Sequence, residues 1–152
     1  MRTASKIFII AVAILALPAF MTAQCTDKCA GSCLKKAAET FVKSVPGNDM
    51  FLMPVETLAE MVDAGKNDYM ILDIRPPKHY ASGHIDGSIN IPLLVLVEKL
   101  DSVPTDKKIA VICSLDTNSA FGVAVLRMHN RNAWIVEGGI FGWEGLERPL
   151  IK

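Results

Sequence analysis

The sequence has no excess of charge of either sign, since 16 Lys and Arg residues balance 16 Asp and Glu residues over 152 positions. A nucleic-acid-binding protein needs a basic face, so this balance argues against nucleic acid as a partner. Aromatic residues make up only 7% of the chain, and no segment repeats at the period of about 20 to 50 residues that repeat proteins show. With 51% hydrophobic residues, the chain is long enough for one ordinary domain with its own core.

Long apolar runs are also lacking, apart from one near the N-terminus. Residues 7–17 are continuously apolar, follow two cationic residues and end before Pro18. This run is shorter than the about 20 residues that a membrane-spanning helix needs, and small residues up to Ala23 complete a pattern typical of a secretory signal. We expect residues 1–23 to be a signal peptide and the protein to be exported, to the periplasm or to the extracellular space. An uncleaved signal segment is the alternative, and it would be the only attachment to a membrane.

Export changes the interpretation of the four cysteines, because thiols outside the cytosol tend to pair or to be put to use. Cys25, Cys29 and Cys33 lie in an N-terminal extension, residues 24–48, in which apolar residues recur at helical spacing. On a helix these three thiols share one face. They could form one disulfide and leave one free thiol, bind a metal that lacks a fourth ligand, or exchange sulfur with Cys113. The spacing matches no common zinc site, so we expect neither a metal nor a cofactor.

Residues 49–152 alternate between strand and helix patterns. The predicted strands are 69–73, 89–91, 108–113 and 133–137, and the predicted helices are 55–63, 93–100, 118–129 and 141–146. Strands separated by helices indicate an α/β fold with a mostly parallel sheet between two helical layers. Sites in such sheets form at the carboxyl ends of the strands. Asp73, Cys113 and Glu137 hold these positions, and Cys113 is the candidate nucleophile among them.

Cys113 precedes a predicted turn of six residues, Ser114 to Ser119, that leads into a helix. The N–H groups of such a turn and the N-terminus of the helix produce a positive potential that favours a thiolate. The thiolate is the nucleophilic form of cysteine. A buried and inert cysteine at a strand end is the alternative, and the spacing alone leaves both interpretations open.

Four motifs in order carry a family resemblance. They are Asp73-Ile-Arg75, the segment Tyr80-Ala-Ser-Gly-His-Ile85 with Gly87-Ser-Ile-Asn-Ile-Pro92, Cys113, and Val136-Glu-Gly-Gly-Ile-Phe-Gly-Trp143. Together they resemble the rhodanese-like domain over about residues 50–150, here in an exported, single-domain form. The resemblance implies a three-layer α/β domain with a central, mostly parallel sheet flanked by helices.

The resemblance also implies a sulfurtransferase in which Cys113 accepts a sulfane sulfur as a persulfide. The loop that would bind the substrate consists of Ser114, Leu115, Asp116, Thr117, Asn118 and Ser119. A small sulfur donor such as thiosulfate, or a protein persulfide, would load the cysteine. A thiol, including a protein thiol, or another nucleophile would then unload it.

This loop departs from the family pattern Cys-x-x-Gly-x-Arg-Ser/Thr at two positions. Asp116 stands where the family has glycine, and Asn118 stands where it has arginine. Both changes make the local field more negative, so we expect poor use of thiosulfate, which is an anionic donor. Two alternatives therefore stay open: a weak or inactive rhodanese module that binds a partner protein, and a thiol redox protein that uses the N-terminal cysteines.

The remaining motif residues have supporting roles in this interpretation. Asp73 and Arg75 match the family's Asp-x-Arg, which either supports the active-site side of the domain or forms a structural ion pair. We expect His84 to be structural. His79 and His129 have no nearby set of ligands in the sequence, which gives no reason to expect a metal site.

Overall fold

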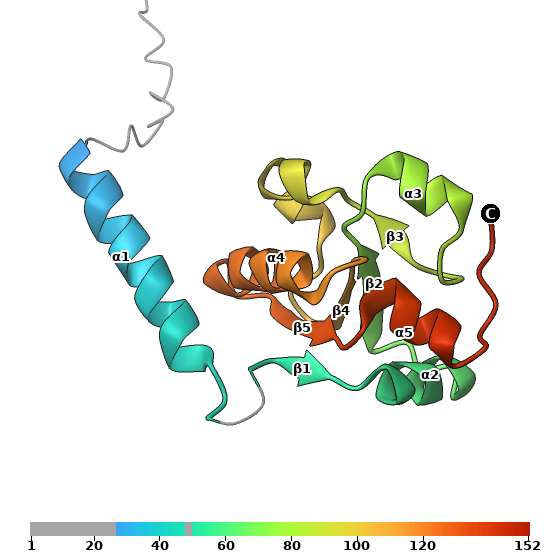
Figure 1. Ribbon diagram of the computed structural model, residues 1–152. Helices are drawn as coiled ribbons and strands as arrows, with labels where there is room; N and C mark the ends of the chain where they lie inside the picture. Colours follow the sequence, from blue (N-terminus) through green and yellow to red (C-terminus); the bar gives the residue numbers. More distant parts are fainter. Residues whose placement is uncertain (1–26, 48–49) are drawn as a thin grey trace, which may run out of the picture.

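The computed structural model describes residues 27–47 and 50–152, with side chains from residue 31 onward (Figure 1). The predicted signal peptide, Cys25 and the side chain of Cys29 lie outside the described residues. In the described part, five parallel strands form one sheet in the order β1-β5-β4-β2-β3. The strands are β1 (Leu52–Met53), β2 (Tyr69–Asp73), β3 (Ile89–Asn90), β4 (Lys108–Ile112) and β5 (Asn132–Val136).

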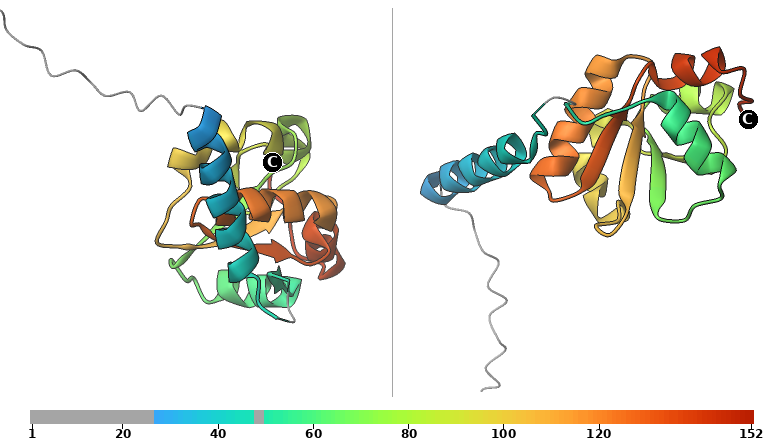
Figure 2. Two further views of the ribbon diagram at one scale, coloured as in Figure 1. Left: turned by 90° about the vertical axis from the view of Figure 1, so that its left-hand side faces the viewer. Right: turned by 90° about the horizontal axis from the view of Figure 1, so that it is seen from below.

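Helices connect these strands and form the outer layers of the domain. The α-helices are α1 (Asp27–Ser44), α2 (Val55–Asp63), α3 (Pro77–Ser82), α4 (Asp116–Met128) and α5 (Gly139–Gly145), and the 3₁₀ segments are η1 (Leu93–Val95) and η2 (Val97–Ser102). The sheet lies between α4 on one face and α2 with α5 on the other (Figure 2). The predicted α/β fold with a parallel sheet covered on both faces is confirmed.

The apolar strands β2 and β4 supply both halves of the core because successive side chains point to opposite faces. Leu72 and Val111 pack on the α4 side, whereas Ile71 and Ile112 pack on the α2 and α5 side. All four side chains are buried. A strand that is buried on both faces has a continuous run of apolar residues in the sequence. For this reason the sequence predicts β2 and β4 correctly.

An ion pair ties the segment after α5 to α2. The guanidinium of Arg148 donates hydrogen bonds to the carboxylate of Asp63 and lies over the ring of Trp143. This pairing lowers the pKa of Asp63 and raises the pKa of Arg148 from their usual values. The contact fastens the C-terminal end of the chain to the α2 layer.

The predicted helical extension is present as α1, which lies beside α4 at the edge of the domain (Figures 1 and 2). Its C-terminal half makes the contact, where the ring of Phe41 lies 6.0 Å from that of Phe51. Residues 31–36 are exposed. Among the described helices, none is both long and apolar enough to cross a membrane.

Three predicted helices differ from the structure. Residues 93–100, predicted as one helix, form η1 and η2, because residues 93–97 are apolar without interruption and so mark no single buried face of a helix. Tight 3₁₀ turns bury Leu96 and leave Leu94 in solvent. The last two helices begin two residues earlier than predicted, α5 at Gly139 instead of residue 141 and α4 at Asp116 instead of residue 118. An acidic side chain in the first turn suits the positive end of a helix, so α4 extends back to this residue.

Candidate active site

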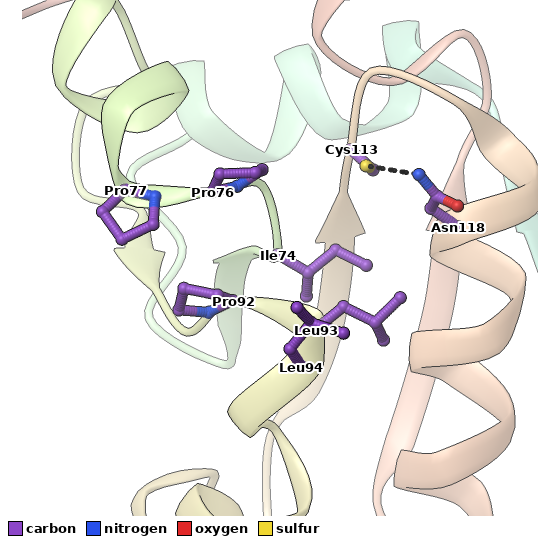
Figure 3. Close-up of a pocket in the computed structure, with 8 residues that line it drawn as sticks. All are labelled: Ile74, Pro76, Pro77, Pro92, Leu93, Leu94, Cys113 and Asn118. Atoms are coloured by element: carbon purple, nitrogen blue, oxygen red, sulfur yellow. Dashed lines mark hydrogen bonds between the residues drawn. The ribbon is translucent and has the colours of Figure 1, made fainter.

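Cys113 lies directly after β4, at the carboxyl end of a strand that has neighbours on both sides. Its side chain is 5% exposed and belongs to the core cluster on the α4 side of the sheet. The side-chain amide Nδ2 of Asn118 donates a hydrogen bond to the thiol Sγ over 3.7 Å (Figure 3). An N–H group from the first turn of α4 therefore points at the sulfur.

The six predicted loop residues occupy different environments. Because α4 begins at Asp116, only Ser114 and Leu115 connect the cysteine to the helix. Asn118 lines the pocket beside Cys113, whereas Ser114 lines a neighbouring pocket. Leu115, Asp116 and Thr117 are exposed. The loop is thus shorter than predicted, and four of its residues form the first turn of a helix.

Ser119 is the buried member of this set. Its side chain is 0% exposed, and its hydroxyl Oγ has no hydrogen-bond partner within the described part of the chain. The residue lies one position after Asn118 in the first turns of α4. Because this buried hydroxyl makes no hydrogen bond there, nothing offsets the cost of its burial.

The carboxylate of Asp116 is bound to backbone and does not line the pocket beside Cys113. Its Oδ2 accepts a hydrogen bond of 3.2 Å from the N–H of Gly138, at the turn between β5 and α5. The sequence places Asp116 in the predicted substrate-binding loop, and the structure shows its carboxylate bound to this turn instead of lining the pocket. The carboxylate joins two segments that are distant in sequence, and its negative charge remains at the N-terminus of α4.

The Gly138-Gly139 turn supports the backbone of Cys113 from the side of α5. The N–H of Ile140 donates a 2.9 Å hydrogen bond to the carbonyl oxygen of Cys113. Gly139 has a φ of +51°, and a Cβ atom there would lie 2.0 Å from the same oxygen. The sequence indicates a turn at these glycines but gives no sign of this close approach to the cysteine.

A pocket of about 370 Å³ opens beside the Cys113 thiol (Figure 3). It lies between the segment after β2, the segment that leads into η1, and the first turn of α4. Its lining consists of Ile74, Pro76, Pro77, Pro92, Leu93, Leu94, Cys113 and Asn118. The six apolar members are not among the site residues predicted from the sequence. The signal that could have found them is their position just after two strands that end at the same edge as β4.

Asp73 and Arg75 form a buried ion pair at the end of β2. The Nε of Arg75 donates to Oδ2 of Asp73 over 2.9 Å, and Nη2 donates to the same oxygen over 2.6 Å. Nη2 also donates to the carbonyl of Gly83 over 2.8 Å. Asn90 donates from its amide to the carbonyls of both residues, which fixes the chain where it leaves the strand. Of the two predicted roles, this geometry favours the structural ion pair.

Removing one partner of this pair should destabilise the domain strongly. We expect Asp73→Ala to lower the free energy of unfolding by about 3 kcal/mol, because it leaves the buried Arg75 charge without its carboxylate. The double variant Asp73→Leu/Arg75→Met should lose less than the single one. Chemical denaturation of the native protein and of the two variants measures both effects. Equal losses in the single and the double variant would show that the pair does not act as a unit.

His84 has the structural environment that the sequence predicts. Its ring stacks on Tyr80 with centroids 3.8 Å apart, and its Nδ1 lies 3.0 Å from the Tyr80 carbonyl oxygen. Its backbone also pairs with Ile151 in both directions. Within the described side chains, no three residues of the types that bind metals gather into a candidate metal site.

Cys33, the N-terminal cysteine whose side chain the structure describes, forms no bond with Cys113. Cys33 is exposed on α1 as a free thiol, and α1 packs near Arg127 at the far end of α4. Cys113 lies at the beginning of α4. Since this helix has 13 residues and each adds about 1.5 Å, its two ends are well separated.

Comparisons with known proteins agree with this arrangement. The family described as the rhodanese-like domain matches residues 54–146. A rhodanese-related protein from Thermoplasma volcanium has a crystal structure that is 36% identical in sequence, with a TM-score of 0.60, covering 65% of this chain and 95% of that one.

Curated relatives include proteins named as sulfurtransferases. A sulfurtransferase from Allochromatium vinosum is 24% identical over 63% of this chain and 90% of its own length. The adenylyltransferase and sulfurtransferase UBA4 of Vanderwaltozyma polyspora is 28% identical over 54% of this chain, but over only 22% of its own length. The chain spans less than two thirds of the length of several curated relatives that it matches.

Proposed function

Because the chain belongs to the rhodanese-like domain family, we propose that it is a sulfurtransferase that carries sulfane sulfur as a persulfide on Cys113. The observation that carries this proposal is the position of the Cys113 thiol. The thiol follows the central strand, receives an N–H from Asn118, and borders a pocket large enough for a donor. Relatives with sulfurtransferase names support the same class of reaction.

The proposed reaction has two steps that exchange one sulfur atom. In the first, the Cys113 thiolate attacks the sulfane sulfur of the donor; an Sγ–S bond forms, the donor's S–S bond breaks, and its electron pair leaves with the carrier group. In the second, an acceptor thiolate attacks the outer sulfur of the persulfide, and Cys113 leaves as a thiolate. Such a covalent route replaces one difficult transfer with two easier ones, and no external oxidant or reductant is needed.

The geometry gives Asn118 and the backbone distinct tasks in this reaction. The Asn118 amide can donate to the sulfur that carries negative charge before and after the transfer. The Ile140 N–H and the Gly138-Gly139 turn hold the cysteine backbone in place. A fixed nucleophile next to a preformed pocket reduces the cost of orienting the donor.

We also propose that the reaction takes place outside the cytosol, with a protein thiol or a small thiol as acceptor. This proposal rests on the apolar N-terminal run of the sequence, which precedes the described residues. The N-terminal cysteines are candidates for a redox role in the same compartment. Cys33, which is exposed on α1, is the one whose side chain the structure describes.

The test is to find where sulfur is added. The reduced protein, residues 24–152, is exposed to thiosulfate and separately to a small organic persulfide, and its intact mass and peptide map are measured. We expect one added sulfur on Cys113 that cyanide or a thiol removes. Sulfur found only on Cys25, Cys29 or Cys33 would move the chemistry to the extension. A folded, reduced protein that takes up no sulfur would contradict the proposal and favour a partner-binding module.

A further inference from the structure

We propose that the pocket beside Cys113 selects sulfane-sulfur donors whose carrier group is apolar, in preference to inorganic thiosulfate. This inference rests on the proposed function, because it assumes that Cys113 is loaded with sulfur. It concerns the carrier that the pocket recognises and not the transfer itself. Organic persulfides and organic thiosulfonates are donors of this kind, because both carry a sulfane sulfur on an apolar group.

The lining of the pocket is almost entirely apolar. Of the eight lining residues, six are leucine, isoleucine or proline, and Cys113 and Asn118 supply the only polar side chains. Both are uncharged when Cys113 is a thiol. No charged side chain among the described residues lines this pocket. A donor that enters it exchanges water for apolar side chains and a single amide, which favours an apolar carrier.

Neither Arg75 nor Asp116 compensates the charge of a dianion in this pocket. Arg75 lines the neighbouring pocket, and its guanidinium is already bound to the carboxylate of Asp73 and to the Gly83 carbonyl. Asp116 adds a negative charge to the first turn of α4, which offsets the positive potential of that helix end. Thiosulfate would therefore lose its water next to Cys113 without a cation to replace it, and this is costly.

The size and walls of the pocket suit a compact apolar group. A cavity of about 150 Å³ is enough to hold benzene, and this pocket has about 370 Å³. Pro76, Pro77 and Pro92 make part of the wall stiff, because proline has little backbone freedom. Leu94 is 95% exposed at the rim (Figure 3). An apolar carrier would cover this side chain, which now faces water.

The loading step with such a donor balances without another reactant. For an organic thiosulfonate, the Cys113 thiolate attacks the terminal sulfur of R–SO₂–S⁻ and forms the new Sγ–S bond. The bond between the two donor sulfurs breaks, and its electron pair leaves on the sulfinate R–SO₂⁻. The product is the Cys113 persulfide anion. Benzenethiosulfonate, methanethiosulfonate and thiosulfate undergo the same step and differ only in the group on the sulfonyl sulfur: phenyl, methyl or O⁻.

The experiment measures the second-order rate constant for loading Cys113 with each of these three donors, by intact mass in single turnover. We expect benzenethiosulfonate to load the protein about tenfold faster than methanethiosulfonate, and thiosulfate to be the slowest. The free thiol N-acetylcysteine is treated with the same three donors. Dividing each ratio of rate constants by the ratio found with N-acetylcysteine corrects for the different leaving groups. Equal corrected rates for phenyl and methyl, or a faster rate with thiosulfate, would overturn the inference.

A variant at the rim links the preference to the pocket. Leu94→Asn should reduce the phenyl-to-methyl ratio to about threefold or less, because it removes apolar surface that the ring covers. Val97→Asn is the matched control, since Val97 is 60% exposed in the neighbouring segment and does not line the pocket. An unchanged ratio in Leu94→Asn would contradict the inference. If no donor adds sulfur to Cys113, the proposed function itself fails, which is a separate result.

Discussion

Cys113→Ser should reduce sulfur transfer by at least about 10³-fold, whichever donor is used. A serine hydroxyl is nearly the same size as a thiol, so the fold and the pocket should persist, and the Asn118 amide keeps an acceptor. The hydroxyl is not ionised near neutral pH, whereas a thiol readily forms the nucleophilic thiolate. Steady-state transfer from an organic thiosulfonate to a thiol measures the loss, and thermal unfolding verifies that the variant is folded.

The control for this prediction is Cys33→Ser, which changes the other cysteine with a described side chain. Cys33 is exposed on α1 and does not line the pocket, so its loss should leave the transfer rate within about twofold if Cys113 alone carries the sulfur. A comparable drop in both variants would support exchange between the extension and Cys113. If Cys113→Ser retains full transfer, the persulfide proposal is wrong. If it abolishes transfer but retains affinity for a partner protein, the domain also acts as a binding module.

The sequence predicts the core of this fold well because the decisive signals are local. Residues 69–72 and 109–113 are short, continuously apolar segments between helical patterns, which indicates buried parallel strands. The position of Cys113 follows from the same reasoning, because it ends the second of these runs. The position of the cysteine needs no knowledge of distant contacts.

The pocket and the shape of the loop depend on contacts that a linear pattern does not contain. Asp116 bonds to the Gly138 amide, 22 positions later in the chain, so its effect on the site is not visible from the motif. The same holds for Leu94, whose place at the rim depends on the 3₁₀ turns that replace the predicted helix. The residue types in the Cys113 loop indicate the chemistry of the site. The packing of distant segments against this loop decides which side chains a donor contacts.

A single methyl group at position 139 should be the most damaging small change in the domain. We expect Gly139→Ala to lower the free energy of unfolding by about 5 kcal/mol. Part of this cost is the positive φ of +51°, which an L side chain tolerates poorly. The rest comes from the 2.0 Å approach of the new Cβ to the Cys113 carbonyl oxygen, which forces the two segments apart.

The clash also predicts a loss of function at temperatures where the variant is still folded. Separating the segments stretches the Ile140 hydrogen bond to the Cys113 carbonyl and moves the cysteine relative to its pocket. We therefore expect slower loading of Cys113 in Gly139→Ala. Gly145→Ala is the matched control, because a Cβ at the end of α5 meets nothing within 4 Å. Chemical denaturation should show a change below about 1 kcal/mol for this control. If Gly139→Ala is equally stable, the backbone of Cys113 is free to move, and the turn cannot be what holds the nucleophile in place.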